Sequence, residues 1–585
     1  MADPVGVVTG LAAVDWAVLG ATIAAIVGYG AWRTFGVRDA DAYVRGEALR
    51  WPTIGLGIMA TQASAITFLS LPGQAYADGM RFVQFYFGLP LATILISAVF
   101  VPVYHRLRVR TAYEYLEHRF DLRVRLLGAL LFLIGRGLAA GITIYAPSII
   151  LSQILGWPLH STIWGIGALV VLYVLLGGSR AVSVTQRQQM IVILIGLVIA
   201  AAIVIARLPD QVSLGGAVRI AGALGRINPV SFQLDFNSRY NFWAGITGGF
   251  FLQLSYFGTD QSQVQRYLSG RSVAEMRLGL LFNGMFKVPM QFLILFIGVM
   301  VFVFFLFTRP PMHFDAPTLA RVEAARPAEV HALEARFDRA FEAQRGAALA
   351  YLAARGTPDE PAVRARLATS AAEIDRVRAD AKQLIQTTLP EAQTRDTDYV
   401  FLTFVLQYIP HGLVGLLLAV ILCAAMSSVA GELIALGSTT AVDFYLRLRE
   451  ALGRPPGSRT RDLRVSQLAM VAWGVIVLGI ASAASLFANL IEAVNILGSL
   501  FYGTILGLFM VALFLRRITA TPVLIGAIVA ELLVVALFLT STLGYLWFNA
   551  IGCATVVVVS ALLQTVLPAA SSPASAPASS APSSG

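Results

Sequence analysis

The chain is divided into apolar runs long enough to cross a lipid bilayer, and this pattern constrains its fold more than any other feature. A membrane helix needs about 20 mainly apolar residues, and inside the bilayer the backbone must satisfy its own hydrogen bonds. We therefore predict an all-α polytopic membrane protein with about 13 transmembrane helices. The predicted spans lie near 15–34, 53–79, 81–105, 126–155, 160–178, 188–207, 240–262, 278–308, 401–445, 466–489, 491–515, 519–540 and 543–567.

The composition excludes a soluble protein of this length. Hydrophobic residues make up 57% of the 585 residues and charged residues 13%, and the mean hydropathy is +0.73. The net charge of +10 comes from arginine clusters between apolar runs, so we expect a lipid bilayer as partner and no nucleic acid. The two cysteines, Cys423 and Cys553, lie in separate apolar runs and are predicted to be packing residues.

The arginine clusters all fall on one side of the membrane when the predicted spans are counted. Basic loops stay in the cytoplasm, so we predict a cytoplasmic (inner or plasma) membrane protein with its N terminus outside and its C terminus in the cytoplasm. No basic segment precedes the first span, which we expect to be retained. The clustered residues are Arg106, Arg108, Arg110, Arg119, Arg123, Arg125, Arg180, Arg187, Arg266, Arg271, Arg447, Arg449, Arg454, Arg459, Arg461, Arg516 and Arg517.

Two segments, 309–398 and 568–585, are not predicted to cross the membrane. The predicted membrane spans lie within 1–308 and 399–567. Residues 309–398 contain 13 Lys/Arg and 14 Asp/Glu, and apolar residues recur at helical spacing, as at Phe337 and Phe341 after Leu333. We predict an extracytoplasmic, mixed-charge helical hairpin that is dispensable for transport. The Pro/Ala/Ser tail at 568–585 is predicted to be disordered.

Two adjacent hydroxyls interrupt the apolar run at 401–445. Ser427 and Ser428 follow Ala424 by about one helical turn, and Glu432 lies one turn further on. Paired hydroxyls beside small residues can supply oxygens to a desolvated cation, although they also occur where helices pack closely. The pattern favours an ion-coupled transporter.

Four motifs in register resemble the sodium:solute symporter family, which includes the sodium/glucose, proline, sialic acid and multivitamin transporters. They are SLPGQAYADG at 70–79, GGSRAV at 177–182, GTDQ with VQR at 258–266, and the segment 424–445 that ends in VDFY. The resemblance covers roughly residues 10–565 apart from 309–398. It implies a leucine-transporter-type core of two inverted five-helix repeats, the first at about 53–207, with an extra N-terminal helix and extra C-terminal helices.

The sequence carries polar interruptions where this fold requires broken helices. The span 53–79 holds Gln62, Ser64 and Thr67 before a Pro-Gly pair, and the span 240–262 holds Gly258, Thr259 and Asp260. Interruptions at corresponding positions of two repeats indicate a transport site near the middle of the membrane, although Pro and Gly also kink packed helices.

The resemblance implies a sodium site and no other cofactor. Its ligands would be the backbone carbonyls of Ala60, Ala63 and Ala424 and the hydroxyls of Ser427 and Ser428. Neutral oxygens suit a hard cation that must also be released.

One difference from the family pattern affects the predicted number of sodium ions per transport cycle. Some members carry an aspartate after the threonine of a Thr-Asp-x-x-Gln run, where it is linked to a second sodium ion or to protons. Here Gln186 follows Thr185. A neutral amide does not supply that negative charge, so we predict one sodium ion per cycle.

The solute is expected to be a small organic molecule bearing a carboxylate, of the sialic acid type or another organic anion. The fork of Arg136, deep in an otherwise uncharged span, suits a planar carboxylate, although Arg136 could instead pair with Glu432 or Asp260. A sugar or a vitamin is the alternative solute. The implied solute-binding residues are Gln62, Ser64, Thr67, Tyr86, Arg136, Asp260, Lys287 and Asn495.

Two other classes of function were weighed. An enzyme would need converging catalytic groups, which the six histidines do not form, so we predict that the chain is not an enzyme. A sensor or scaffold on a transporter-like core would normally carry an output domain, and none follows the last span.

Overall fold

The computed structural model describes residues 11–34, 49–392, 394–454, 458–483 and 490–567. Within these ranges the chain is helical, and no strand occurs beyond a single bridge between Leu49 and Gly270. The predicted all-α class is therefore confirmed. The tail at 568–585, predicted to be disordered, lies outside the described residues.

Ten helices in the described part of the chain are long and apolar enough to cross a membrane. They correspond to ten of the thirteen predicted spans, and the other three spans contain a short or interrupted helix. The span 53–79 forms α3 (Trp51–Gln62) and α4 (Ala65–Asp78), and 160–178 lies in the first part of α9. The span 240–262 forms η3 (Ala244–Gly248) and α11 (Gly249–Gly258), and α12 (Gln261–Leu268) follows.

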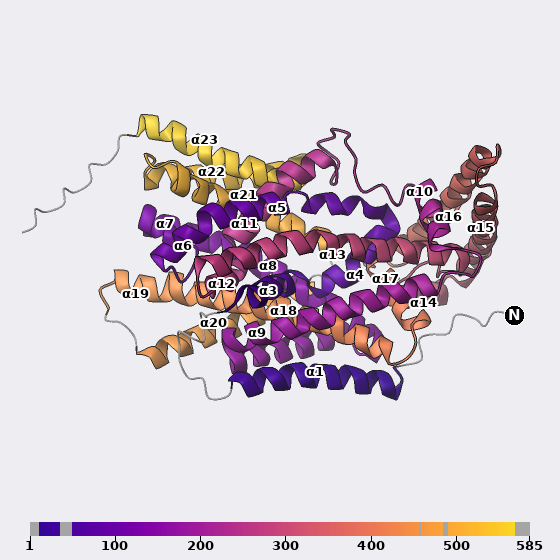
Figure 1. The fold of residues 1–585 in the computed structure, drawn as a ribbon, viewed down its shortest axis with the longest axis horizontal. Helices are drawn as coiled ribbons and strands as arrows, with labels where there is room; N and C mark the ends of the chain where they lie inside the picture. The colour runs from indigo at the N-terminus through magenta and orange to yellow at the C-terminus, as the bar shows by residue number, and fades with distance from the viewer. Residues whose placement is uncertain (1–10, 35–48, 393, 455–457, 484–489, 568–585) are drawn as a thin grey trace, which may run out of the picture.

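The remaining helices up to α13 lie before, between and after these segments along the chain. They are α1 (Ala13–Thr34), η1 (Gly79–Tyr86), α5 (Leu89–Leu95), η2 (Ile96–Phe100), α6 (Val101–Leu107), α7 (Glu114–Arg119), α8 (Leu122–Leu155), α9 (Leu159–Ala206), α10 (Leu214–Ala223) and α13 (Val273–Phe307). In the centre of the molecule α8, α13 and α18 pack around the interrupted helices (Figure 1).

The helix α9 folds back on itself between two predicted spans. The hydroxyl of Tyr173 is hydrogen-bonded to the hydroxyl of Thr185, twelve residues later. In a straight helix the two Cα atoms would be about 18 Å apart, which is beyond the combined reach of these side chains. The chain therefore turns between 160–178 and 188–207, as two separate spans require.

The second half of the chain completes the bundle. Its helices are α17 (Thr397–Tyr408), α18 (Leu413–Thr439), η4 (Thr440–Leu446), α19 (Arg447–Ala451), α20 (Arg459–Ala483), α21 (Leu490–Phe514), α22 (Ala520–Thr540) and α23 (Leu546–Val566). The helix α18 is buried along nearly its whole length and packs against α1, α8, α9 and α20. Cys423 in α18 and Cys553 in α23 are both free and buried.

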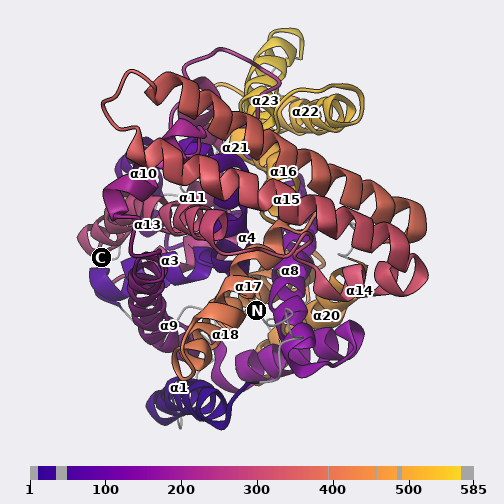
Figure 2. The same cartoon turned by 90° about the vertical axis from the view of Figure 1, so that its right-hand side faces the viewer.

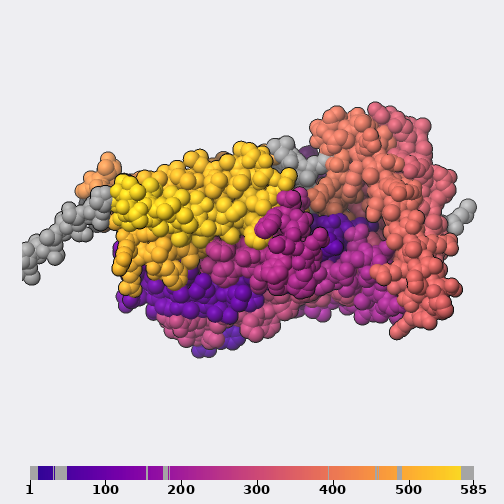
Figure 3. Space-filling view, turned by 90° about the horizontal axis from the view of Figure 1, so that it is seen from above, coloured from indigo at the N-terminus to yellow at the C-terminus, as the bar shows by residue number. Residues whose placement is uncertain are grey.

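Residues 309–398 form a separate helical unit at one end of the elongated molecule. Its helices are α14 (Ala316–Ala325), α15 (Pro327–Ala353) and α16 (Glu360–Thr388). Phe337 and Phe341 of α15 are buried in a small core shared with Ile374 and Val377 of α16. Figures 2 and 3 show the hairpin of α15 and α16 lying across the end of the membrane helices.

The two ends of the molecule carry different helices. α1 begins at the end that carries α15 and α16, whereas α23 ends at the opposite end (Figure 1). The helices α6, α7 and α19, which carry Arg106, Arg119, Arg447 and Arg449, lie at that opposite end.

Candidate functional site: two helix breaks around a polar cavity

The first helix break separates α3 from α4 and lies deep in the bundle. Ala63 has a φ of −81° and a ψ of 75°, and Ser64 begins α4 from an extended conformation. The helix ladder is interrupted here, since the Ser64 amide donates to the carbonyl of Gln62 over 3.0 Å. A break of this kind frees backbone carbonyls near the end of α3, which is tolerated inside a membrane only where the groups face protein or a cavity.

The second break separates α11 from α12 at Thr259 and Asp260. The Asp260 side chain caps α12 by accepting hydrogen bonds from the amide of Ser262 over 2.8 Å and from its hydroxyl over 2.6 Å. A carboxylate at the N terminus of a helix compensates the free amides there. The two interruptions expected from the sequence are therefore true helix ends.

The residues predicted to bind sodium gather at the first break. The Ser427 hydroxyl lies 2.8 Å from the carbonyl oxygen of Ala60 and 3.0 Å from that of Ala424. The Ser428 hydroxyl donates to the carbonyl of Thr61 over 2.8 Å, and Ala63 follows at the break itself. All of these residues are buried. The cluster offers neutral carbonyl and hydroxyl oxygens, which is the ligand chemistry that a hard monovalent cation takes.

Gln186 joins this cluster, a contact that the sequence analysis did not foresee. Its side-chain amide nitrogen donates to the hydroxyl of Thr61 over 3.0 Å and to the carbonyl of Ser427 over 2.9 Å. The amide therefore links α9 to both α3 and α18.

A polar cavity of about 80 Å³ opens on the other side of the first break. Six of the eight predicted solute-binding residues line it: Gln62, Ser64, Thr67, Tyr86, Arg136 and Asn495. The other lining residues were not predicted from the sequence; they are Ile66, Phe85, Leu252, Gln253, Tyr256, Ile491, Val494 and Tyr502. Of these, Gln253 and Tyr256 lie in α11 within two turns of the second break. Their closeness in sequence to that break could have identified them as lining residues.

Arg136 reaches the cavity from α8 and is held by two acidic residues. Its Nε lies 3.5 Å from Asp260 Oδ2, and its Nη1 lies 3.7 Å from Glu432 Oε1. Arg136 Nη2 also donates to Ser262 Oγ over 2.9 Å and to the hydroxyl of Tyr256 over 3.2 Å. The internal ion pair considered as an alternative from the sequence is therefore present, and the same arginine lines the cavity.

The other two predicted residues lie behind the cavity wall. Asp260 accepts a hydrogen bond from the Tyr502 hydroxyl over 2.9 Å, so it supports both Tyr502 and Arg136. Lys287 is buried in α13, with Nζ 6.0 Å from the centre of the Tyr86 ring. Both residues contact lining residues and are not among them.

The chain is similar in sequence to two human transporters. Human sodium/iodide cotransporter is 34% identical over 299 residues, which cover 50% of this chain and 45% of that protein. Human sodium-coupled monocarboxylate transporter 1 is 34% identical over 243 residues, which cover 42% of this chain and 39% of that protein. The chain thus spans less than half of the length of these relatives.

A solved structure of a Na+-coupled sialic acid symporter, substrate-bound and outward-open, matches 95% of this chain and 98% of that chain. The TM-score is 0.73 at 22% identity, which shows the fold: the leucine-transporter type, with two inverted five-helix repeats. The model of the sodium:solute symporter family matches residues 43–327 and 381–530. The chain therefore belongs to the sodium:solute symporter family.

Proposed function

We propose that this protein is a sodium-coupled secondary active symporter that imports a small organic anion. One observation carries the proposal: the break between α3 and α4 contributes to both clusters. Ala60 and Thr61 accept hydrogen bonds from Ser427 and Ser428, whereas Gln62 and Ser64, one to three residues later, line the polar cavity.

This shared break accounts for coupling in physical terms. Sodium at Ala60, Ala63, Ala424, Ser427 and Ser428 would fix the end of α3 against α18. Fixing that end also fixes Gln62 and Ser64, so the solute meets an ordered site only when sodium is bound. The ion and the solute stabilise the same arrangement, which is the reciprocal coupling that symport requires.

Anionic solutes are favoured by Arg136 and by the named relatives. Arg136 brings a guanidinium to the wall of a cavity that is otherwise lined by neutral groups. The relatives' names specify iodide and monocarboxylates, both of which are anions. A cavity of about 80 Å³ suits a short monocarboxylate better than a large sugar acid. We therefore narrow the carboxylate class expected from the sequence to small monocarboxylates.

The proposed orientation places α15 and α16 outside, and α6, α7 and α19, which carry or adjoin the clustered arginines, in the cytoplasm. The positive-inside rule supports this assignment, because these three helices lie at the same end of the molecule (Figure 1). The described chain then begins outside and ends inside.

Uptake into proteoliposomes tests the function. Labelled lactate should accumulate when an inward sodium gradient is imposed and should not accumulate in equimolar potassium. Iodide, glucose and sialic acid serve as competitors in the same assay. Sodium-independent lactate flux would overturn the coupling, and uptake inhibited by glucose but not by other monocarboxylates would overturn the anionic assignment.

A further inference from the structure

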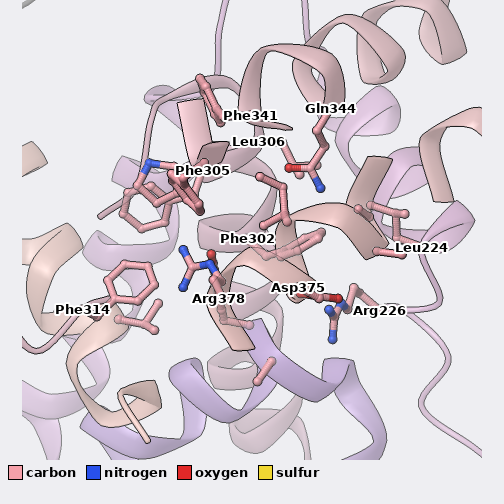
Figure 4. Close-up of a pocket in the computed structure, with 18 of the residues that line it drawn as sticks. Leu224, Arg226, Phe302, Phe305, Leu306, Phe314, Phe341, Gln344, Asp375 and Arg378 are labelled. Atoms are coloured by element: carbon pink, nitrogen blue, oxygen red, sulfur yellow. The ribbon is translucent and has the colours of Figure 1, made fainter. Parts of the chain in front are cut away.

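A second and larger hollow lies where the hairpin of α15 and α16 meets the outer end of the membrane helices. This cleft has a volume of about 610 Å³, within the usual range for small-molecule sites, and far exceeds the central cavity. Its walls come from the end of α4, the segment after α10, the end of α13, and both helices of the hairpin (Figure 4).

The sequence of α16 creates this space. Alanines face the cleft at Ala368, Ala371, Ala372 and Ala379, at the three- and four-residue intervals that place them on one side of a helix. Val377 of α16 is buried against α15 instead, whereas Ile374 belongs to the same core and also reaches the cleft. The hairpin is therefore held together on one side, and the alanines on the other side leave space toward the membrane helices between the charged side chains of α16.

The opposite wall is aromatic. Phe302 and Phe305 of α13 both pack edge-on against Tyr76 of α4, with ring centres 5.5 and 6.2 Å apart. Phe314 completes the group at 5.6 Å from the Tyr76 ring. Such a wall favours a ligand with a flat or branched apolar body.

The charged groups of the cleft sum to one more positive than negative charge. Arg226, Arg378 and Lys382 line it together with Asp375 and Asp396. Asp396 is already compensated, because Lys382 lies 3.5 Å away and the Phe314 amide donates to it over 2.7 Å. The excess of one positive charge matches a ligand with a single negative charge.

Arg226 is the cation best placed to receive that charge. Its guanidinium stands 4.9 Å from the centre of the Phe302 ring, and its buried Nε has no hydrogen-bond partner among the described residues. Its backbone is fixed to the outer end of α4, because the Met80 amide donates to the Arg226 carbonyl over 2.9 Å. Gly79 makes this contact possible: at its φ of +73°, a Cβ would approach the Arg226 carbonyl oxygen to 2.5 Å.

Arg378 frames the aromatic side of the same space. Its guanidinium lies 5.0 Å from the Phe314 ring centre and 5.4 Å from that of Phe337, and it donates to the Pro311 carbonyl over 3.0 Å. Figure 4 shows Arg378 and Arg226 on either side of Phe302.

The family model leaves residues 328–380 unmatched, between its two matched segments. Most of the hairpin wall, including Phe337 and the alanine face of α16, falls in this interval. The hairpin wall of the cleft therefore lies outside the segments that the family model matches, whereas the wall from α4 and α13 lies inside them.

We propose that the cleft binds an organic monoanion with an aromatic or branched apolar body. The carboxylate is received by Arg226, and the apolar body lies against Phe302, Phe305 and Phe314 beneath the alanines of α16. This site is separate from the central cavity and does not depend on sodium.

Direct binding to the full-length protein in nanodiscs tests the proposal, with phenylacetate as the probe in sodium-free choline buffer. Phenylacetate should bind and benzyl alcohol should not compete, because benzyl alcohol lacks the charge. Arg226→Gln should weaken binding about tenfold or more, by removal of a charge-assisted hydrogen bond. Arg376→Gln is the matched control, since Arg376 lies on α16 with 74% of its side chain exposed.

Further variants separate the cleft from the central site and from effects on folding. Ala372→Trp fills the cleft without changing charge and should abolish phenylacetate binding, whereas Arg136→Ala should leave it unchanged. Binding that is lost in Arg136→Ala but kept in Arg226→Gln would place the ligand in the central cavity and overturn the proposal. Unchanged binding in both Arg226→Gln and Ala372→Trp, or decanoate binding far more tightly than phenylacetate, would also overturn it, the latter in favour of an acyl-chain site.

Discussion

The side-chain amide of Gln186 donates a hydrogen bond to the backbone carbonyl of Ser427 over 2.9 Å, within the cluster proposed to bind sodium. The same nitrogen donates to the Thr61 hydroxyl over 3.0 Å. An N–H group thus points its partial positive charge at two oxygens that a second cation would otherwise use. In the wild-type chain the uncharged side-chain amide of Gln186 occupies the space beside these oxygens.

We expect one sodium ion per solute, because this amide occupies the oxygens of Thr61 and Ser427. Reversal potentials measured in proteoliposomes should give that ratio. Gln186→Asp removes the N–H donor and adds a negative charge, so it should introduce a second cation dependence or proton sensitivity. A ratio of two in the wild-type protein would refute this reasoning.

Ser427→Ala and Ser428→Ala should each raise the half-saturating sodium concentration. Losing one oxygen ligand costs about 1–3 kcal/mol, or about tenfold to a hundredfold in affinity. Ser438→Ala is the control, since Ser438 is also buried in α18 and bonds only to the Ala435 carbonyl of its own helix among the contacts described. Sodium dependence that stays at the wild-type value in both variants would eliminate the site.

Arg136→Lys should weaken monocarboxylate affinity markedly, because lysine keeps the charge and loses the fork. Arg136→Ala should nearly abolish uptake while sodium binding, measured by calorimetry, remains. Glu432→Gln tests the ion pair. If Arg136 has only a structural role, Arg136→Ala and Glu432→Gln should both lower the yield of folded protein. Folded Arg136→Ala protein that transports lactate normally would contradict the proposed role.

Replacing residues 328–380 by a short Gly/Ser linker should leave sodium-coupled uptake within about a few-fold of wild type, because the hairpin has its own core. The retained flanks lie close together, since Arg321 of α14 and Glu391 are joined by a 3.0 Å ion pair, so a short linker can connect them. The same deletion should abolish phenylacetate binding in the cleft. If the shortened protein reaches the membrane but does not transport, the hairpin belongs to the gate.

Acid should loosen the attachment of the hairpin through His313. Burial lowers the pKa of His313, and Asp396 at 3.3 Å only partly opposes this. Below about pH 6.5, the usual pKa of histidine, the unfolded segment binds a proton that the folded segment resists, so the local free energy of unfolding falls as the pH falls. Protection factors for amide hydrogen exchange, which correct for the slower intrinsic exchange in acid, should therefore be smaller across 310–326 at about pH 5.5 than at about pH 7.5, and His313→Asn should remove the difference.

The sequence was a good guide to elements whose signal is local. Apolar runs located the membrane helices, and the polar interruptions at Ser64 and Asp260 located both helix breaks. Six of the eight predicted solute-binding residues line one cavity because they lie close to these breaks in sequence or on the helices that face them.

Contacts between distant segments could not be predicted. Tyr502 enters the central cavity from α21, and its bond to Asp260 joins residues 242 positions apart. The sequence did not decide whether Arg136 pairs with Glu432 or with a solute carboxylate, because the residues next to Arg136 in the chain are compatible with both. The outer cleft depends on how α16 sits over α13, which the alanine spacing alone does not reveal.

The burial of both native cysteines makes this chain a ready background for site-specific labelling. Cys423 and Cys553 lie inside the helix bundle, so a thiol-reactive dye should leave them unmodified. Ala372→Cys would then place one environment-sensitive fluorophore on the cleft wall, opposite the end of α4. Its emission would report on occupancy of the cleft, and on displacement of α4 during turnover, as an optical signal in real time.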